Sequence, residues 1–314
     1  MALGTNNVTK TTADKFIPEI WSDEIVAAYK ANLVAANLFS KMSFKGKKGD
    51  VLHIPKPTRG AASAKSASTQ VTLIAATESE ILVNINKHYE YSRFIEDIVE
   101  TQAISSLRKF YTEDAGYAIA KQVDTDLVRL GRLVNGATLG TDDYATAASA
   151  TKAFLGSNGT TVYNSSSSNA AALADAGIRR SIQRLDDADV PMSDRMLIVP
   201  PTTRNTLNGI ARFTEQAFTG EVGSSNTIRN GMVGDVYGVK VYVSTNADAG
   251  AGSSGTDRIC LMAHKSAFCL AEQMGVRSQT QYKQEWLATL FTSDMLYGVA
   301  ELRDDAAVAL AVPA

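Results

Sequence analysis

The sequence feature that most constrains the fold is one long amphipathic helix, which the apolar pattern predicts between residues 104 and 134. At about 1.5 Å per residue, such a helix is on the order of 45–50 Å long. It is much longer than the mean globular helix of roughly 11–12 residues. A helix of this length with a single apolar stripe is typical of a strut that lies beneath a sheet. The positions that keep the helical spacing are Ile104, Leu107, Tyr111, Ala115, Ala118, Ile119, Val123, Leu127, Leu130 and Val134.

A long two-stranded arm is predicted before this helix, over residues 50–91. Its first strand, 51–54, is ended by two prolines, and its return strand alternates apolar and polar residues over 81–86. Residues 58–70 between them are almost all small or polar, so they predict a loop without a core of its own. Because an isolated hairpin is marginally stable in water, we expect this arm to lie on another surface.

The rest of the chain predicts a mixture of helices and strands. Polar residues 1–15 indicate an extended arm, and a helix is expected from about Pro18 to near Ser40. Residues 136–170 are rich in Gly, Ser and Thr and indicate a surface insertion. The other predicted elements are helices over 178–185 and 202–213, short strands over 196–199, 239–243 and 259–262, long antiparallel strands over 267–296 and a closing strand over 306–312.

Composition excludes several classes of protein. The 314 residues are 45% hydrophobic, which is enough for one large domain or two ordinary ones. The 31 Lys+Arg and 33 Asp+Glu give no overall basic charge of the kind that nucleic-acid binders carry. No apolar run approaches the roughly 18 residues that span a membrane, and two cysteines are too few for a disulfide framework. We therefore expect neither a membrane protein nor a secreted mini-protein.

Residues that would support catalysis or metal binding are not found together in the sequence, which contains three histidines and none of the common catalytic motifs. His53 and His88 could face each other across the hairpin, but ordinary strand histidines are the favoured interpretation. Asp124 and Asp126 are two residues apart on the predicted helix, so their side chains point to different sides. Cys260 lies in an apolar strand and is interpreted as a core residue. No catalytic, cofactor-binding or metal-binding residue is predicted, and no cofactor is expected.

The order of these elements resembles the major capsid protein of tailed double-stranded DNA bacteriophages, which has the Hong Kong 97-type fold. Residues 18–25 resemble the opening helix of many such coat proteins, and residues 49–55 resemble the G-D-x-h-x-h-P start of their extended loop. Residues 238–244 are similar to the G-h-x-V-x-x-S strand of the axial domain, and residues 302–310 to the C-terminal return.

The resemblance implies an α+β fold with an N-terminal arm, an extended β-hairpin loop, a peripheral domain with a long spine helix, and an axial domain. The boundaries it implies are 1–48 for the N-terminal arm and helix, 49–92 for the extended loop, 93–170 for the peripheral domain with its Gly/Ser-rich insertion, 171–268 for the axial domain, 269–296 for peripheral-domain strands and 297–314 for the return strand.

The implied function is that of a structural subunit, not an enzyme. Copies would assemble as pentamers and hexamers into an icosahedral shell around the phage genome, located in the virion capsid and assembled in the bacterial cytoplasm. If the gene begins at Met1, only about 17 residues precede the first helix, so a separate scaffolding protein is expected. A portal and a cement protein are the other implied partners, whereas direct binding of the enclosed DNA is expected to be weak or absent and no membrane is involved.

Local charge gives an independent reason to expect self-association. Residues 41–65 contain seven basic residues against one acidic residue, and residues 90–126 contain eight acidic against four basic residues. We hypothesise that the hairpin docks on the acidic face of a neighbouring subunit's spine helix. The alternative is that both segments are ordinary solvated surfaces, where exposed pairs are worth about 0–1 kcal/mol each. The candidate interface residues are Lys45, Lys47, Lys48, Lys56, Arg59, Glu96, Asp97, Glu100, Glu113 and Asp114.

Two other functions stay open from the sequence. An encapsulin-like bacterial nanocompartment shares this fold and differs in enclosing a cargo protein. A soluble monomeric enzyme would assemble its site from scattered residues. Such an enzyme would be compact, whereas a shell subunit needs long arms without cores of their own, as residues 1–15 and 50–91 are predicted to be.

Overall fold

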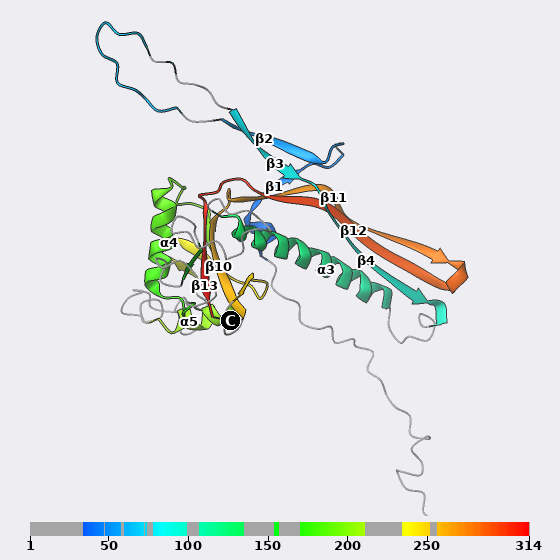
Figure 1. Cartoon of the computed structure of the whole chain (residues 1–314). Coiled ribbons are helices and arrows are strands. Elements are labelled where there is room, and N and C mark those ends of the chain that lie inside the picture. Colours follow the sequence, from blue (N-terminus) through cyan, green and yellow to red (C-terminus); the bar gives the residue numbers. More distant parts are fainter. Residues whose placement is uncertain are drawn as a thin grey trace, which may run out of the picture.

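The computed structural model describes residues 34–46, 48–57, 60–71, 73, 78–98, 107–134, 154–156, 170–210, 234–251 and 256–313. These residues form an α+β structure with three sheets: a long four-stranded sheet, a seven-stranded sheet and a two-stranded hairpin. The long sheet and one helix extend sideways from the body that the seven-stranded sheet forms, and the hairpin extends from the top (Figure 1). No helix among the described residues is long and apolar enough to cross a membrane.

The long sheet is built around two extended antiparallel strands, β11 (Phe268–Lys283) and β12 (Ala288–Glu301). They confirm the long antiparallel strands expected over 267–296, although β12 continues five residues further. β4 (Lys87–Glu96) pairs with the outer side of β12, and the short β1 (Ser40–Ser43) pairs in parallel with the first residues of β11. The order of strands is therefore β1-β11-β12-β4.

The predicted long helix is confirmed as α3 (Leu107–Arg129), which continues into a 3-10 turn at Leu130–Arg132. It lies along the long sheet and contacts β4, β11 and β12, as Figure 1 shows. Four buried apolar residues are spaced four apart on α3, so they form one row that faces the sheet. These residues are Ala115, Ile119, Val123 and Leu127.

The seven-stranded sheet forms the body of the subunit, with the order β5-β13-β10-β6-β8-β7 and β9 paired to β10. Every residue of β6 and of β13 is buried, which explains why these strands appear in the sequence as continuous apolar runs. The elements of this part are β5 (Phe154–Gly156), α4 (Asp175–Asp187), β6 (Arg195–Val199), α5 (Pro201–Asn208), β7 (Asp235–Val236), β8 (Val239–Val243), β9 (Ala249–Ala251), β10 (Thr256–His264) and β13 (Ala307–Val312). The predicted closing strand is confirmed as β13, which pairs with β10.

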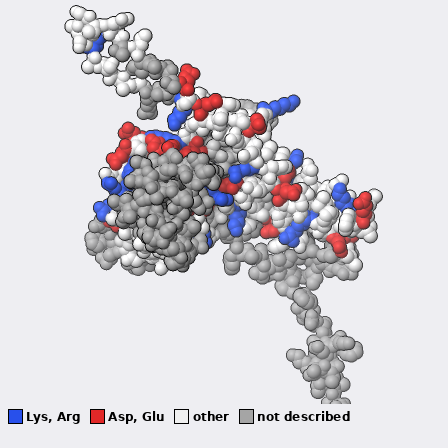
Figure 2. All heavy atoms as spheres, in the orientation of Figure 1, with Lys and Arg blue, Asp and Glu red and all other residues white. Residues whose placement is uncertain are grey.

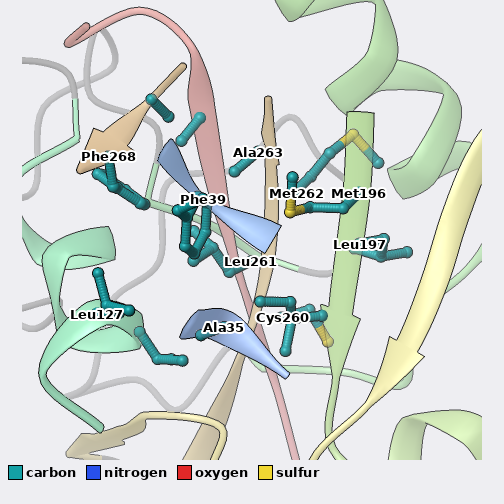
Figure 3. Close-up of a cluster of buried hydrophobic side chains, with 14 of the residues drawn as sticks. Ala35, Phe39, Leu127, Met196, Leu197, Cys260, Leu261, Met262, Ala263 and Phe268 are labelled. Atoms are coloured by element: carbon teal, nitrogen blue, oxygen red, sulfur yellow. The ribbon is translucent and has the colours of Figure 1, made fainter. Parts of the chain in front are cut away.

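One hydrophobic core joins the long sheet, α3 and the seven-stranded sheet. Phe39, just after the short helix α1 (Ala35–Leu38), packs edge-to-face against Phe268 with ring centroids 5.0 Å apart. Figure 3 shows Phe39 with Leu127 of α3 and Phe268 on one side and Leu261 of β10 on the other. The segment around α1 therefore links the two larger sheets.

The hairpin is shorter than the sequence predicted. β2 (Val51–Pro57) pairs with β3 (Glu78–Asn84), and the pairing ends at Val51 and Asn84. The chain then crosses to β4, which belongs to the long sheet. Residues 87–91, which were predicted to belong to the hairpin, therefore belong to the long sheet. The described loop residues 60–71 are all exposed and extend away from the body (Figure 1).

Two predicted helices are described only in part. The helix expected between Pro18 and Ser40 appears as α1, and residues 18–33 lie outside the described residues. The helix expected over 202–213 ends as α5 at Asn208, and residues 211–213 lie outside the description. The predicted N-terminal arm and most of the 136–170 insertion also lie outside it.

The hairpin crosses the long sheet at Gly298 of β12. A Cβ atom at this position would overlap the carbonyl oxygen of Asn84 and would crowd the Cα atom of Ile85. Both of these are backbone atoms, which cannot rotate away as a flexible side chain can. Glycine is therefore required here by the close approach of two chain segments.

We expect Gly298→Ala to lower the free energy of unfolding by about 3 kcal/mol, because the hairpin base must shift away from β12. Gly116→Ala on α3 is the matched control: its Cβ meets nothing within 4 Å, and alanine favours a helix by up to about 1 kcal/mol. Urea unfolding of both variants measures the difference. Equal stability of the Gly298 variant and the parent chain would contradict the close approach.

Candidate subunit-interface surfaces

Of the basic candidate residues that the structure describes, Lys45 and Lys48 lie at the hairpin base and Lys56 lies further along β2. Lys45, in the turn after β1, has its Nζ atom 3.6 Å from Glu272 Oε2, and its side chain is 58% exposed. Lys48 is exposed just before β2, and Lys56 is exposed near the end of that strand. Lys47 and Arg59 lie outside the described residues.

The acidic candidate residues lie at the far end of the long sheet, which we call the arm tip (residues 94–98, 110–114 and 282–287). Glu96 ends β4 and is exposed, and Asp97 accepts a hydrogen bond from the Tyr282 hydroxyl at 2.7 Å. Glu113 is exposed near the start of α3, and Asp114 accepts a hydrogen bond from Tyr91 at 2.9 Å. Glu100 lies outside the described part of the chain.

The two charged groups are separated along β11. Lys45 lies beside Glu272, whereas Asp97 lies beside Tyr282, ten residues further along this strand. At about 3.3 Å per residue, Lys45 and Asp97 are roughly 33 Å apart, so these two residues cannot pair with each other within one subunit. In the view of Figure 2, side chains of both signs are interspersed along the long sheet, so the acidic excess is not a uniformly acidic face.

The arm tip also exposes apolar side chains that the sequence analysis missed. Phe94, Ile98, Trp286 and Leu287 are 56%, 60%, 71% and 66% exposed, and the rings of Phe94 and Trp286 lie 6.4 Å apart. The turn between β11 and β12 contains no Gly or Pro and reverses through Leu287 in the left-handed conformation. Without a turn signal, the sequence did not show where the strands end.

Asp126 fixes α3 to the long sheet. Its carboxylate accepts a 2.7 Å hydrogen bond from the buried Tyr297 hydroxyl, and Lys87 Nζ lies 3.1 Å from the same oxygen. Burial, together with the Asp126 carboxylate, raises the pKa of Tyr297 well above its usual value, so this hydroxyl stays protonated as a donor. The contact joins the helix to β12 and to the start of β4.

Asp124, two residues earlier, joins α3 to other segments. Its Oδ1 atom accepts backbone N–H bonds from Val34 and Ala35 at 3.1 and 2.7 Å. Its Oδ2 atom accepts a 3.0 Å bond from the side-chain amide of Asn246, which follows β8. The prediction that Asp124 and Asp126 point to different sides is confirmed, and both are buried structural groups.

His53 and His88 lie in strands of different sheets and do not face each other, so the favoured interpretation as ordinary strand histidines is confirmed. His53 lies opposite Leu82, and its Nδ1 atom is 2.8 Å from Glu80 Oε2. His88 belongs to β4, and its Nε2 atom is 3.0 Å from Asp294 Oδ2. The two histidines were assigned to one hairpin because the sequence shows no break between β3 and β4.

The side chains that could bind a metal ion or act as nucleophiles are dispersed over the described residues. No group of three or more His, Cys, Asp or Glu among them could hold a metal ion. Cys260 is fully buried, as predicted, and burial raises its pKa to about 12. Burial likewise raises the pKa of Cys269 to about 11, so neither thiol forms the thiolate that a nucleophile requires near neutral pH.

A family model described as phage capsid protein matches residues 37–312. The chain belongs to the phage capsid protein family. The predicted resemblance to phage coat proteins is thereby confirmed, and with it a structural, shell-forming role in the virion capsid. The nanocompartment and the monomeric enzyme find no support in the comparisons. No curated protein matches the sequence significantly.

Solved phage capsid structures share the fold of this capsid protein. A Mycobacterium phage Che8 chain is 21% identical, with a TM-score of 0.72 and 98% of each chain covered. The capsid of cyanophage P-SCSP1u is 20% identical, with a TM-score of 0.71, 99% of this chain and 96% of that chain covered. The cyanophage Pam1 capsid is 13% identical, with a TM-score of 0.71 and 99% of each chain covered.

On the outer face of the capsid protein's long sheet, Asp294 accepts two hydrogen bonds from Arg277, at 2.7 and 2.9 Å. Hydrogen bonds from Arg277 and His88 lower the pKa of Asp294 to about 2. Because the folded-state pKa lies below the ordinary value of 3.8, the stabilisation is complete above pH 3.8. It is lost as the pH falls from 3.8 through about 2.

We expect Asp294→Asn to destabilise the capsid protein by about 1–2 kcal/mol at neutral pH, because a charged hydrogen-bond acceptor is removed next to partly exposed donors. The difference from the parent chain should shrink as the pH falls toward 2. Urea unfolding at pH 7, 4 and 2.5 measures this change, and Glu285→Gln, at an exposed position in the turn between β11 and β12, is the control. A difference that stays constant with pH would contradict the role of the Asp294 charge.

Proposed function

We propose that copies of this capsid protein assemble as pentamers and hexamers into an icosahedral shell that encloses a double-stranded DNA genome. We further propose that the hairpin base of one subunit contacts the arm tip of another. The observation that supports this contact is the placement of opposite charges at the two ends of one long sheet, roughly 33 Å apart. Opposite charges that cannot meet within a subunit favour head-to-tail contact between subunits.

The hairpin supports the same proposal through its small core. Among the described residues, the cluster beneath it has three buried members and five partly buried ones: Val83, Cys269 and Ala271, with Met42, Leu52, Ile54, Ala300 and Leu302 packed against them. The exposed loop at 60–71 adds no buried side chain. A segment with so little apolar burial gains stability from a neighbouring subunit more readily than from its own chain.

The proposed domain assignment follows the sheets. The seven-stranded sheet with α4 and α5 corresponds to the axial domain, and the long sheet with α3 to the peripheral domain. The axial domain would meet its copies at the five-fold and six-fold centres, as the fold family implies. The hairpin base and the arm tip would then serve the contacts away from these centres.

The proposed partners beyond the subunit itself are a separate scaffolding protein, a portal and a cement protein. Assembly is proposed to take place in the bacterial cytoplasm. Direct contact with the enclosed DNA is proposed to be weak or absent, because the chain has a net charge of −2 and phosphate contacts depend on an excess of Lys and Arg.

We expect the purified full chain, with its scaffolding protein where one is required, to form megadalton shells. Sedimentation velocity and negative-stain microscopy measure particle size at low and high salt. Because exposed charge pairs are screened by salt, shells should form less completely above about 0.5 M salt. A stable 33.5 kDa monomer in the presence of the co-expressed phage assembly proteins would contradict the proposal.

The contact itself is tested by charge reversal. The triple variant Lys45→Glu, Lys47→Glu and Lys48→Glu should impair assembly at least tenfold while the subunit stays folded, since the one described ion pair among them is on the surface and worth about 0–1 kcal/mol. Circular dichroism checks the fold, and sedimentation checks assembly. Normal shells from this variant would show that the charge argument is wrong.

The matched control is a charge swap. Adding Glu96→Lys, Glu100→Lys and Glu113→Lys to the triple variant restores the opposite signs at the two ends of the long sheet. Assembly should then recover in part, whereas the acidic-end variant alone should assemble poorly. If the variant with all six substitutions assembles no better than either triple variant, these surfaces do not meet.

A further inference from the structure

Glu301, the last residue of β12, lies where the hairpin, the long sheet and the turn into β13 meet. Its Oε1 atom is buried and has no hydrogen-bond partner. On one side, Glu301 lines a groove of about 840 Å³ together with residues of β3, β4 and α3. The turn that follows it, residues 302–305, lines a second cleft of about 910 Å³ beneath β2. A polar oxygen without a partner at such a junction requires an explanation.

The charges around Glu301 do not compensate an ionised carboxylate. Lys56 of β2 attracts it, whereas Asp304 and Asp305 of the following turn repel it. No cation among the described residues lies within ion-pair distance of Glu301. The neighbouring Arg303 pairs with Asp305 instead, at 2.7 Å. The charged and titratable groups that line the groove from the other elements are Lys87 and His88 of β4, Tyr89 of the same strand, and Asp126 and Arg129 of α3.

Lys87, which lines the same groove, already has a partner. Its Nζ atom lies 3.1 Å from Asp126, where it helps to hold α3 on the long sheet. Lys56, on β2 of the hairpin, is the cation whose charge attracts the Glu301 carboxylate. Any movement of β2 changes both the charge and the hydration at Glu301.

We propose that the protonation of Glu301 controls how closely the β2–β3 hairpin lies against the subunit. With Glu301 neutral, the carboxyl group can be buried without a cation, and the hairpin base lies down as the structure has it. When Glu301 ionises, the attraction of Lys56 does not compensate the buried carboxylate, so the carboxylate requires water and β2 must lift to admit it. This inference concerns the position of the hairpin within one subunit and goes beyond the proposed contact with a neighbour.

The direction of the pH dependence follows from the two states. Burial, with repulsion from Asp304 and Asp305, raises the pKa of Glu301 to about 8 in the closed state. In an open state with a hydrated carboxyl group, the pKa returns toward 4.5. The closed state therefore binds the proton more tightly. Its stabilisation is complete below pH 4.5 and is lost as the pH rises from 4.5 through about 8.

The experiment measures a distance from the hairpin to the body of the subunit. Spin labels on Glu78→Cys of β3 and Arg180→Cys of α4 report it, and the natural Cys260 and Cys269 are buried and stay unlabelled. The labelled full chain is diluted with unlabelled chain, so that only distances within one subunit are recorded. Between pH 5 and pH 9 we expect the distance distribution to lengthen in the parent chain.

Glu301→Gln keeps the side chain neutral and should hold the short distance at both pH values. Glu90→Gln, on the exposed side of β4, should respond as the parent chain does. A parent chain with the same distance at pH 5 and pH 9, or a Glu301→Gln chain that opens with the parent, would overturn the proposal.

A second variant keeps the test open if Glu301→Gln fails to fold. Lys56 is exposed, so Lys56→Gln should fold, and it removes the one attraction that favours ionised Glu301 in the closed state. The opening at pH 9 should then be larger than in the parent chain. An opening equal to or smaller than that of the parent would exclude Glu301 as the controlling group.

Discussion

The packing of α3 along one face of the long sheet is the contact on which the rest of the subunit depends. The row from Ala115 to Leu127 supplies the apolar burial. Asp126 fixes the helix to Tyr297 and Lys87, and Asp124 fixes it to the segment at Val34 and to Asn246. Because these buried carboxylates are fully hydrogen-bonded, a shift of the helix by one turn would leave charges without partners. The polar contacts therefore set the position of a helix that its apolar row alone would allow to slide.

The hairpin is attached to this frame by a much smaller contact. Its chain crosses β12 where Gly298 leaves room for Asn84, and its cluster with Cys269 and Ala271 is small. The hairpin has fewer buried apolar contacts than the long sheet and α3, so of these parts the hairpin changes its position more readily. The carboxyl group of Glu301 lies at this attachment, so a single proton acts at the point where the subunit is easiest to move.

Much of this architecture could be predicted from the sequence, because long periodic segments carry a strong signal. The helical spacing through Leu127 gave α3, and the apolar runs gave β6 and β13. The break between β3 and β4 could not be predicted, because the alternation continues through Ile85 and only the register with β12 separates the strands. Because of that error, His53 and His88 were expected in one hairpin, where a pairing was possible. The exposed arm tip was missed for a similar reason: its turn depends on the backbone conformation of Leu287, not on a Gly or Pro.

The sequence predicted which charged residues belong to the candidate interface, but it did not predict where these residues lie in the structure. The sequence identified Lys45 and Asp97 as members of opposite groups, and only the register of β11 shows that they lie at opposite ends of one sheet. In the contact that we propose, different ends of the sheet meet, and such heterologous contacts can continue from copy to copy. Each exposed pair contributes about 0–1 kcal/mol, so single contacts open and close freely. A subunit that joins in the wrong orientation can then dissociate and rejoin, whereas a closed shell is held by many such contacts at once.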